Sequence, residues 1–156
     1  MLPLDGAAKP RVFIQTEFAE TYPAFSPDGR WVAFTSAESG RSEIYVVPFP
    51  GPGGKWQVSQ GGGTFARWRG DSAELFFQSE EGLMSAVVDG RRTAFVVGKI
   101  TPLFKPRIRD VGFGGSNAQN YDVTPDGQRF LIAVTEDAPI EPPITLLVNW
   151  PAVLER

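Results

Sequence analysis

Three aspartates are the first side chains of this sequence whose repetition suggests chemistry. Asp28 and Asp126 each stand between a proline and a glycine, and Asp71 follows a glycine in a looser copy of the same pattern. Two carboxylates held close together can act as a general acid and a general base. These aspartates, however, lie 43 and 55 residues apart in order, at equivalent positions of successive repeats. Equivalent positions are distant in space, so we interpret them as turn residues.

The residue types that most enzymes rely on are missing. The chain contains no histidine and no cysteine, which excludes Ser-His-Asp and Cys-His catalysis, thiolate metal sites and disulfides. The glycine-rich segment 112–117 is a poor phosphate-binding loop, because it lacks the last glycine of G-x-G-x-x-G and no helical pattern follows it. We therefore expect no catalytic residue, no metal site and no cofactor.

Arginines are the candidates for binding a partner. Arg67 and Arg69 flank Trp68 at the end of an expected strand, and Arg107 and Arg109 form the densest basic spot of the chain. Arginine is a good anchor for protein or peptide partners. For Arg107 and Arg109, two readings stay open: contact with an acidic peptide, or a solvated loop. Arg67 and Arg69 could line a channel or a loop face. The acidic, proline-rich segment 136–143 is likewise either an exposed turn or a docking segment.

Charge and hydropathy exclude two classes of partner. The net charge is −3, and acidic and basic residues are mixed along the chain, so no basic stripe is present to neutralise a phosphate backbone. The N-terminus lacks the features of a signal peptide. The apolar stretch 144–150 is seven residues long, whereas a spanning helix needs roughly 20. We expect neither nucleic-acid binding nor a membrane segment in this chain.

The elements that position these residues should be β-strands. Glycine (17) and proline (14) are frequent and spread along a chain that is 42% hydrophobic, which is typical of many short strands joined by turns. In the first turn, Ser26, Pro27, Asp28 and Gly29, the proline presets φ for a type I turn and the glycine can adopt positive φ. Thr124, Pro125, Asp126 and Gly127 repeat it. In the middle copy Gly70 replaces proline and Ser72 replaces glycine, so that turn should be less well specified.

Strands expected around the three turns define three repeated units. They cover 21–25, 30–36, 43–48 and 55–59, then 64–68, 73–79, 83–88 and part of 93–103, then 120–124, 129–135 and 144–150. The first spacing of 43 residues matches a four-stranded propeller blade, and an insertion would explain the longer second spacing. The second strands, such as Trp31–Phe34 and Phe130–Ala133, are apolar at consecutive positions, which predicts strands covered on both faces.

We therefore predict an all-β partial β-propeller of about three four-stranded antiparallel blades. Residues 1–19 would end a preceding blade with an outer strand at 11–17. Blade one covers 20–60, blade two 61–104, an insertion loop 105–119, and blade three 120–156 without its outer strand. Because open strand edges promote pairing with another chain, strand 11–17 of one copy could complete blade three of another and give a homodimer.

Several of these segments resemble a known family. Residues 25–34, followed by 39–41 and 44–46, resemble the PD40 repeat of TolB-like propellers. The order of 44–59, 61–63, 67–69, 121–130 and 144–150 is similar to the C-terminal propeller end of bacterial serine/threonine protein kinases. The resemblance covers about residues 2–154. It implies that the blades belong to a six-bladed ring, and that the ring is a non-catalytic, extracytoplasmic sensing or binding domain for a protein or peptide ligand.

Two alternatives remain open. One is a TolB-like periplasmic scaffold, and the other is the gating propeller of a serine peptidase. The polypeptide upstream of Met1 discriminates among them, since a kinase domain with a membrane segment, a signal peptide, or neither would precede this chain.

Overall fold

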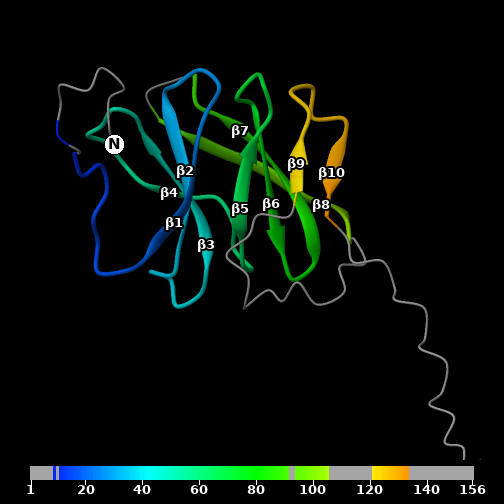
Figure 1. Cartoon of the computed structure of the whole chain (residues 1–156), viewed down its shortest axis with the longest axis horizontal. Coiled ribbons are helices and arrows are strands. Elements are labelled where there is room, and N and C mark those ends of the chain that lie inside the picture. The colour runs from blue at the N-terminus through cyan, green and yellow to red at the C-terminus, as the bar shows by residue number, and fades with distance from the viewer. Residues whose placement is uncertain (1–8, 10, 92–93, 106–120, 134–156) are drawn as a thin grey trace, which may run out of the picture.

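The computed structural model of this protein describes residues 9, 11–91, 94–105 and 121–133. They form three antiparallel β-sheets, which lie side by side in chain order (Figure 1). Sheet one has the order β1 (Glu20–Phe25), β2 (Trp31–Ser36), β3 (Glu43–Pro48) and β4 (Trp56–Gln57). Sheet two has the order β5 (Thr64–Trp68), β6 (Glu74–Ser79), β7 (Gly82–Asp89) and β8 (Val96–Phe104). Sheet three pairs β9 (Tyr121–Val123) with β10 (Phe130–Ile132).

The expected all-β class and the first two four-stranded antiparallel units are confirmed. Most strand ends agree within one or two residues, although the fourth strand of sheet one is reduced to Trp56–Gln57. In the third unit, β9 and β10 are the strands that fall within the described part of the chain. The expected strand 144–150 and nearly all of the expected insertion loop lie outside the described residues.

Sheets one and two share one hydrophobic core. β5 packs against β1, β2 and β3. Trp31 of β2 lies at the centre of this core, with ring centroids 4.9 Å from Phe95 and 5.6 Å from Trp56. The Trp31 indole N–H donates to the Gly90 carbonyl (3.1 Å), and the Trp68 indole N–H donates to the Ala24 carbonyl (3.1 Å). Each bond crosses from one sheet to the other, so the indole groups fix how the sheets face each other.

Burial follows the predicted pattern in two of the three second strands. All six residues of β2 are buried, as are five of the six residues of β6. β10 departs from the expectation, because Leu131 at its centre is 79% exposed while Phe130 and Ile132 pack toward sheet two. The physical reason is that, among the described residues, a neighbouring sheet covers only the face of β10 that carries Phe130 and Ile132.

The predicted strand at 11–17 is wrong, because these residues form no strand. Phe13 instead packs on Phe49, with ring centroids 5.3 Å apart, and Ile14 lies with it against the segment from Val47 to Gly53. This segment contains Pro48, Pro50 and Pro52, which have no N–H to offer a strand ladder. The homodimer through strand exchange stays a prediction.

Candidate binding surface

The first and third hairpin turns have the same hydrogen bonds. The Ser26 hydroxyl donates to the Asp28 carboxylate (2.6 Å) and accepts the Trp31 N–H (3.0 Å), while Gly29 has φ +70°. Thr124, Asp126 and Gly127 repeat this arrangement, again with φ +70° at the glycine. The side-chain oxygens thus close the turn in both copies, and Asp28 and Asp126 serve the local structure of their hairpins.

The middle turn reaches a similar shape with different side chains. Ser72 stands at the glycine position with φ 59°, a conformation that costs a non-glycine residue free energy. Arg69 stands at the serine position, and its guanidinium binds both carboxylate oxygens of Asp71 at 2.8 Å and one of Glu74 at 2.7 Å. The turn that the sequence predicts to be less well specified therefore has a strained backbone at Ser72. The bidentate ion pair between Arg69 and Asp71 offsets the cost of this strain.

The three turns also join the sheets, and they lie in a row at the top of Figure 1. The Asp28 N–H donates to the Ser72 hydroxyl (3.2 Å), and the Gly70 N–H donates to the Pro125 carbonyl (2.8 Å). A Cβ at position 70 would lie 2.8 Å from the same carbonyl oxygen. Gly70 thus departs from the proline of the other copies because this contact needs both a free N–H and the absence of a side chain.

The carboxylates of the turns have lowered pKa values. Hydrogen bonds from Arg69 lower the pKa of Asp71 from 3.8 to about 2, helped by the Ala73 N–H. Burial raises the pKa of Asp28, but hydrogen bonds from Ser26 and Arg30 outweigh it and hold the pKa below its ordinary value. The Thr124 hydroxyl lowers the pKa of Asp126 in the same way. Three ionised carboxylates with satisfied hydrogen bonds are unsuited to general acid catalysis.

The candidate arginines fall in different places. Arg67 lies in β5, 3.9 Å from the Asp122 carboxylate of β9, and also donates to the Ala66 carbonyl (2.8 Å). Arg69 is held by Asp71 and Glu74 in the middle turn, as described above. Arg107 and Arg109 lie outside the described residues. The structure therefore brings Arg67 close to Asp122 of β9, whereas the guanidinium of Arg69 has three acceptor contacts.

Sequence reasoning missed an aromatic pair on the first strands of sheets one and two. Tyr22 of β1 and Phe65 of β5 have ring centroids 4.2 Å apart, and both have positive φ, 53° and 57°. Each lies where the register of its hairpin shifts, which marks a β-bulge. Strained residues and bulges concentrate at functional sites. The two residues are 43 positions apart, like Asp28 and Asp71, so the repeat itself was the signal that could have found them.

Tyr121 of β9 ties the third sheet to this same region. Its hydroxyl lies 2.6 Å from the Phe65 carbonyl and 3.0 Å from the Phe76 carbonyl, and donates toward both. Burial raises the pKa of Tyr121, so the hydroxyl keeps its proton and remains a donor. The first strands of all three sheets thus meet around Tyr22, Phe65, Arg67 and Tyr121.

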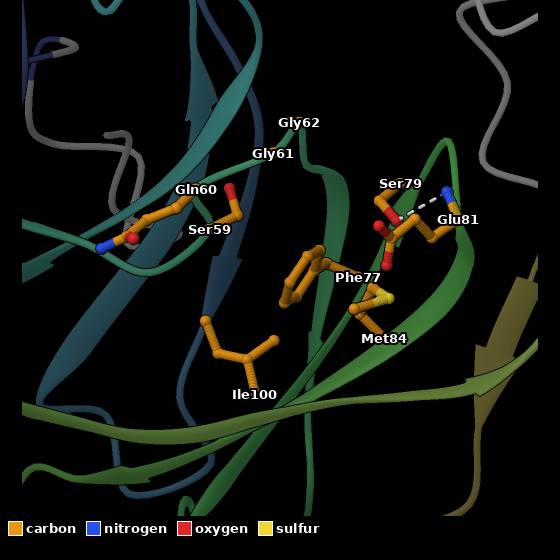
Figure 2. Close-up of a pocket in the computed structure, with 9 residues that line it drawn as sticks. All are labelled: Ser59, Gln60, Gly61, Gly62, Phe77, Ser79, Glu81, Met84 and Ile100. Carbon is orange, nitrogen blue, oxygen red and sulfur yellow. Dashed lines mark hydrogen bonds between the residues drawn. The ribbon is translucent and has the colours of Figure 1, made fainter.

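A cavity of about 200 Å³ opens between sheets one and two at the end opposite the turns (Figure 2). Phe77, Met84 and Ile100 form its apolar floor, and Ser59, Gln60, Gly61, Gly62, Ser79 and Glu81 form its walls. In Figure 2 the Glu81 side chain turns back toward Ser79, so that its carboxylate lies over the cavity, whereas the Gln60 amide points away. The Glu81 N–H donates to the Ser79 hydroxyl (3.2 Å), which fixes this tight turn.

A buried carboxylate holds the other wall of the cavity in place. Glu43 is 1% exposed and accepts hydrogen bonds from the Ser59 hydroxyl and the Gly62 N–H (3.0 Å), with Arg41 as its ion-pair partner at 3.0 Å. A buried charge is costly unless it is paired in this way. Glu43 therefore orders the loop of residues 59–63, which forms the wall of the cavity on the side of sheet one.

No group of three or more metal-ligating side chains occurs within the described ranges of the chain. In those same ranges, no helix has the length and apolar character needed to cross a membrane. The sequence matches no known protein-family model and no curated protein.

Proposed function

We propose that this protein is a non-catalytic β-propeller segment that serves as a binding or sensing scaffold for a protein or peptide ligand. The observation that carries the proposal is the repetition of one structural unit. Sheets one and two share their strand order, their inner bulge with a strained aromatic residue, and their first hairpin turn, at a constant offset of 43 residues. Units of this length stacked face to face are the building principle of propellers.

Two exposed apolar side chains support a ring that contains further sheets on either side of these three. Phe25 of β1 occupies the position that Trp68 occupies in β5, yet Phe25 is 57% exposed and Trp68 only 8%. Leu131 of β10 corresponds to Ala33 of β2, which is fully buried between sheets one and two. In a ring, the position of Phe25 would be covered by a preceding sheet and that of Leu131 by a following one.

The binding surface in this proposal is formed by the first strands of the sheets. Tyr22 and Phe65 offer a pair of contacting rings, and Arg67 and Asp122 offer charges beside them. Rigid aromatic residues and arginine dominate the energetics of protein–protein contacts. Strain held at Tyr22 and Phe65 is explained if the bulges orient these side chains for a ligand.

Panning a random peptide library against the chain tests the scaffold role. Selected peptides are expected to bind saturably and to lose about tenfold or more in affinity when Arg67 is replaced by alanine, as expected of a hot-spot residue. Arg91→Ala is the matched control, because Arg91 is an exposed arginine paired with Asp89 outside this surface. Saturable binding that is equally insensitive to both substitutions would exclude this surface, and the absence of any binding peptide would exclude the scaffold role.

The family resemblance adds the proposed context, which is the extracytoplasmic part of a bacterial serine/threonine kinase. Determining the coding sequence upstream of Met1 tests it directly. A kinase domain followed by a membrane segment is the expected result. A signal peptide alone would instead favour a periplasmic scaffold.

A further inference from the structure

The cavity between sheets one and two has a composition that differs from the hydrophobic core beside it. Its floor is apolar, since Phe77 and Met84 are core residues, and one wall is backbone. Its rim carries the carboxylate of Glu81, for which the described part of the chain provides no ion pair. A hydrophobic hollow with one carboxylate at its mouth is complementary to a side chain that has an apolar stem and a positive end.

Gly61 contributes the bare wall. A Cβ at this position would meet no atom within 4 Å, and its φ is not in the left-handed region. Neither close packing nor backbone conformation therefore requires a glycine at position 61. Gly61 therefore adds no side chain to the wall of the cavity.

The size of the cavity limits what it can accept. At about 200 Å³ it is smaller than the roughly 300–1,000 Å³ of sites for drug-sized ligands. One long side chain fills such a space, but a nucleotide or a sugar cofactor does not. Lysine carries its ammonium as a compact charge on a flexible four-carbon stem that packs well along apolar surface. The Phe77 ring and the Met84 thioether are favourable neighbours for such a stem and its charge.

We propose that this cavity is a site for the lysine side chain of a peptide or protein partner. The aliphatic stem lies on Phe77, Met84 and Ile100, and the ammonium pairs with the Glu81 carboxylate at the rim. This inference rests on the proposed scaffold function and adds the chemistry of one contact, at a surface separate from Tyr22, Phe65 and Arg67. A bound ligand could therefore contact the protein at two places.

Met84 provides the means to test it. The chain has two methionines, Met1 and Met84, so labelling the methionine methyl groups with ¹³C places one of only two signals in the cavity. The full chain is titrated with N-acetyl-lysine methylamide and, separately, with its uncharged norleucine counterpart. We expect the Met84 signal to shift saturably with the lysine compound at millimolar concentrations, as suits a single side chain. Norleucine, without the ammonium, should bind more weakly.

Two matched variants identify the carboxylate. Glu81→Gln should weaken the binding of the lysine compound by about threefold, the size expected for one exposed ion pair. Glu80→Gln removes the same charge from the same turn but does not line the cavity, so it should leave the affinity unchanged. Both glutamates are exposed, and neither substitution threatens the fold.

Three results would overturn the proposal: a Met84 signal that does not move, equal binding of norleucine, or equal effects of the two variants. None of these results would contradict the proposed scaffold function, because that function is tested separately by the peptide selection and its dependence on Arg67. Conversely, the peptide selection could fail while the Met84 signal shifts saturably. This combination would support the lysine site and exclude the proposed scaffold role.

Discussion

The rings of Tyr22 and Phe65 pack with their centroids 4.2 Å apart and their planes tilted by 37°, although each residue holds a backbone conformation that side chains disfavour. The two residues come from different sheets, and their bulges bring the rings together. Left-handed backbone at a non-glycine residue costs about 1–2 kcal/mol. The ring contact and the contacts between the sheets must therefore offset this cost at two positions.

Because the backbone at Phe65 is strained, the glycine variant at this position should be more stable than the alanine variant, the reverse of the usual order. Phe65→Gly and Phe65→Ala both remove the ring contact, but only alanine retains the left-handed penalty, so the glycine variant should be the more stable by about 1 kcal/mol. At Arg67, on the same strand and without positive φ, alanine should be the more stable by about 0.5–1 kcal/mol. Urea unfolding of the four variants checks this. If alanine were more stable than glycine at both positions, the backbone strain assigned to Phe65 would be contradicted.

Alanine substitutions at the equivalent positions Phe25 and Trp68 should reduce stability by unequal amounts. Trp68→Ala should destabilise the protein by about 3–5 kcal/mol, because a buried indole and its bond to the Ala24 carbonyl are lost. Phe25→Ala should cost only about 1 kcal/mol, since the ring is more than half exposed and contacts Phe49 at its edge. Thermal and urea unfolding measure both. Comparable losses would show that the face of Phe25 is covered in solution.

Gly70 predicts a steric effect between sheets two and three. Gly70→Ala places a Cβ 2.8 Å from the Pro125 carbonyl oxygen, and the shift needed to relieve it should cost about 1–3 kcal/mol. Gly61→Ala is the control, because a Cβ there meets nothing within 4 Å and should change stability by less than about 0.5 kcal/mol. Amide hydrogen exchange at Tyr121 should accelerate in the first variant only. Unchanged exchange at Tyr121 would argue against the contact.

The lowered pKa of Asp71 predicts acid sensitivity. A carboxyl whose folded pKa lies below its unfolded value stabilises the folded state above the unfolded pKa, and loses that contribution as pH falls through the folded pKa. For Asp71 the window runs from 3.8 down to about 2, and Asp28 and Asp126 shift in the same direction. The free energy of unfolding should thus fall between pH 4 and pH 2. Asp71→Asn should show a shallower fall over that range, measured by urea unfolding at each pH, and an identical slope would refute the assignment.

Much of the local architecture could be predicted because its causes are local. The Ser-Pro-Asp-Gly and Thr-Pro-Asp-Gly segments carry their turn chemistry within four residues, and the structure forms both turns with Gly29 and Gly127 at positive φ. β3 and β5 have the predicted ends. The predicted strand at 11–17 was wrong. The composition of this segment suits a strand, but the segment lies against prolines, which have no N–H for pairing.

The candidate surfaces were only partly predictable. Arg67 was identified from its place beside Trp68, and the structure adds its approach to Asp122. The cavity bounded by Met84 and Glu81 was missed, because it forms between two sheets and its residues follow no pattern along the chain. Nothing in the sequence near Arg69 indicates that its guanidinium is held by Asp71 and Glu74.

The sequence alone thus determined that this chain folds into repeated antiparallel strands, since turn chemistry and strand hydrophobicity act over a few residues. Only the tertiary structure decided how the three turns join one sheet to the next. It also decided that Tyr22 and Phe65 are strained and that Gly70 must be glycine. These features depend on contacts between residues more than 40 positions apart, and packing between sheets sets them.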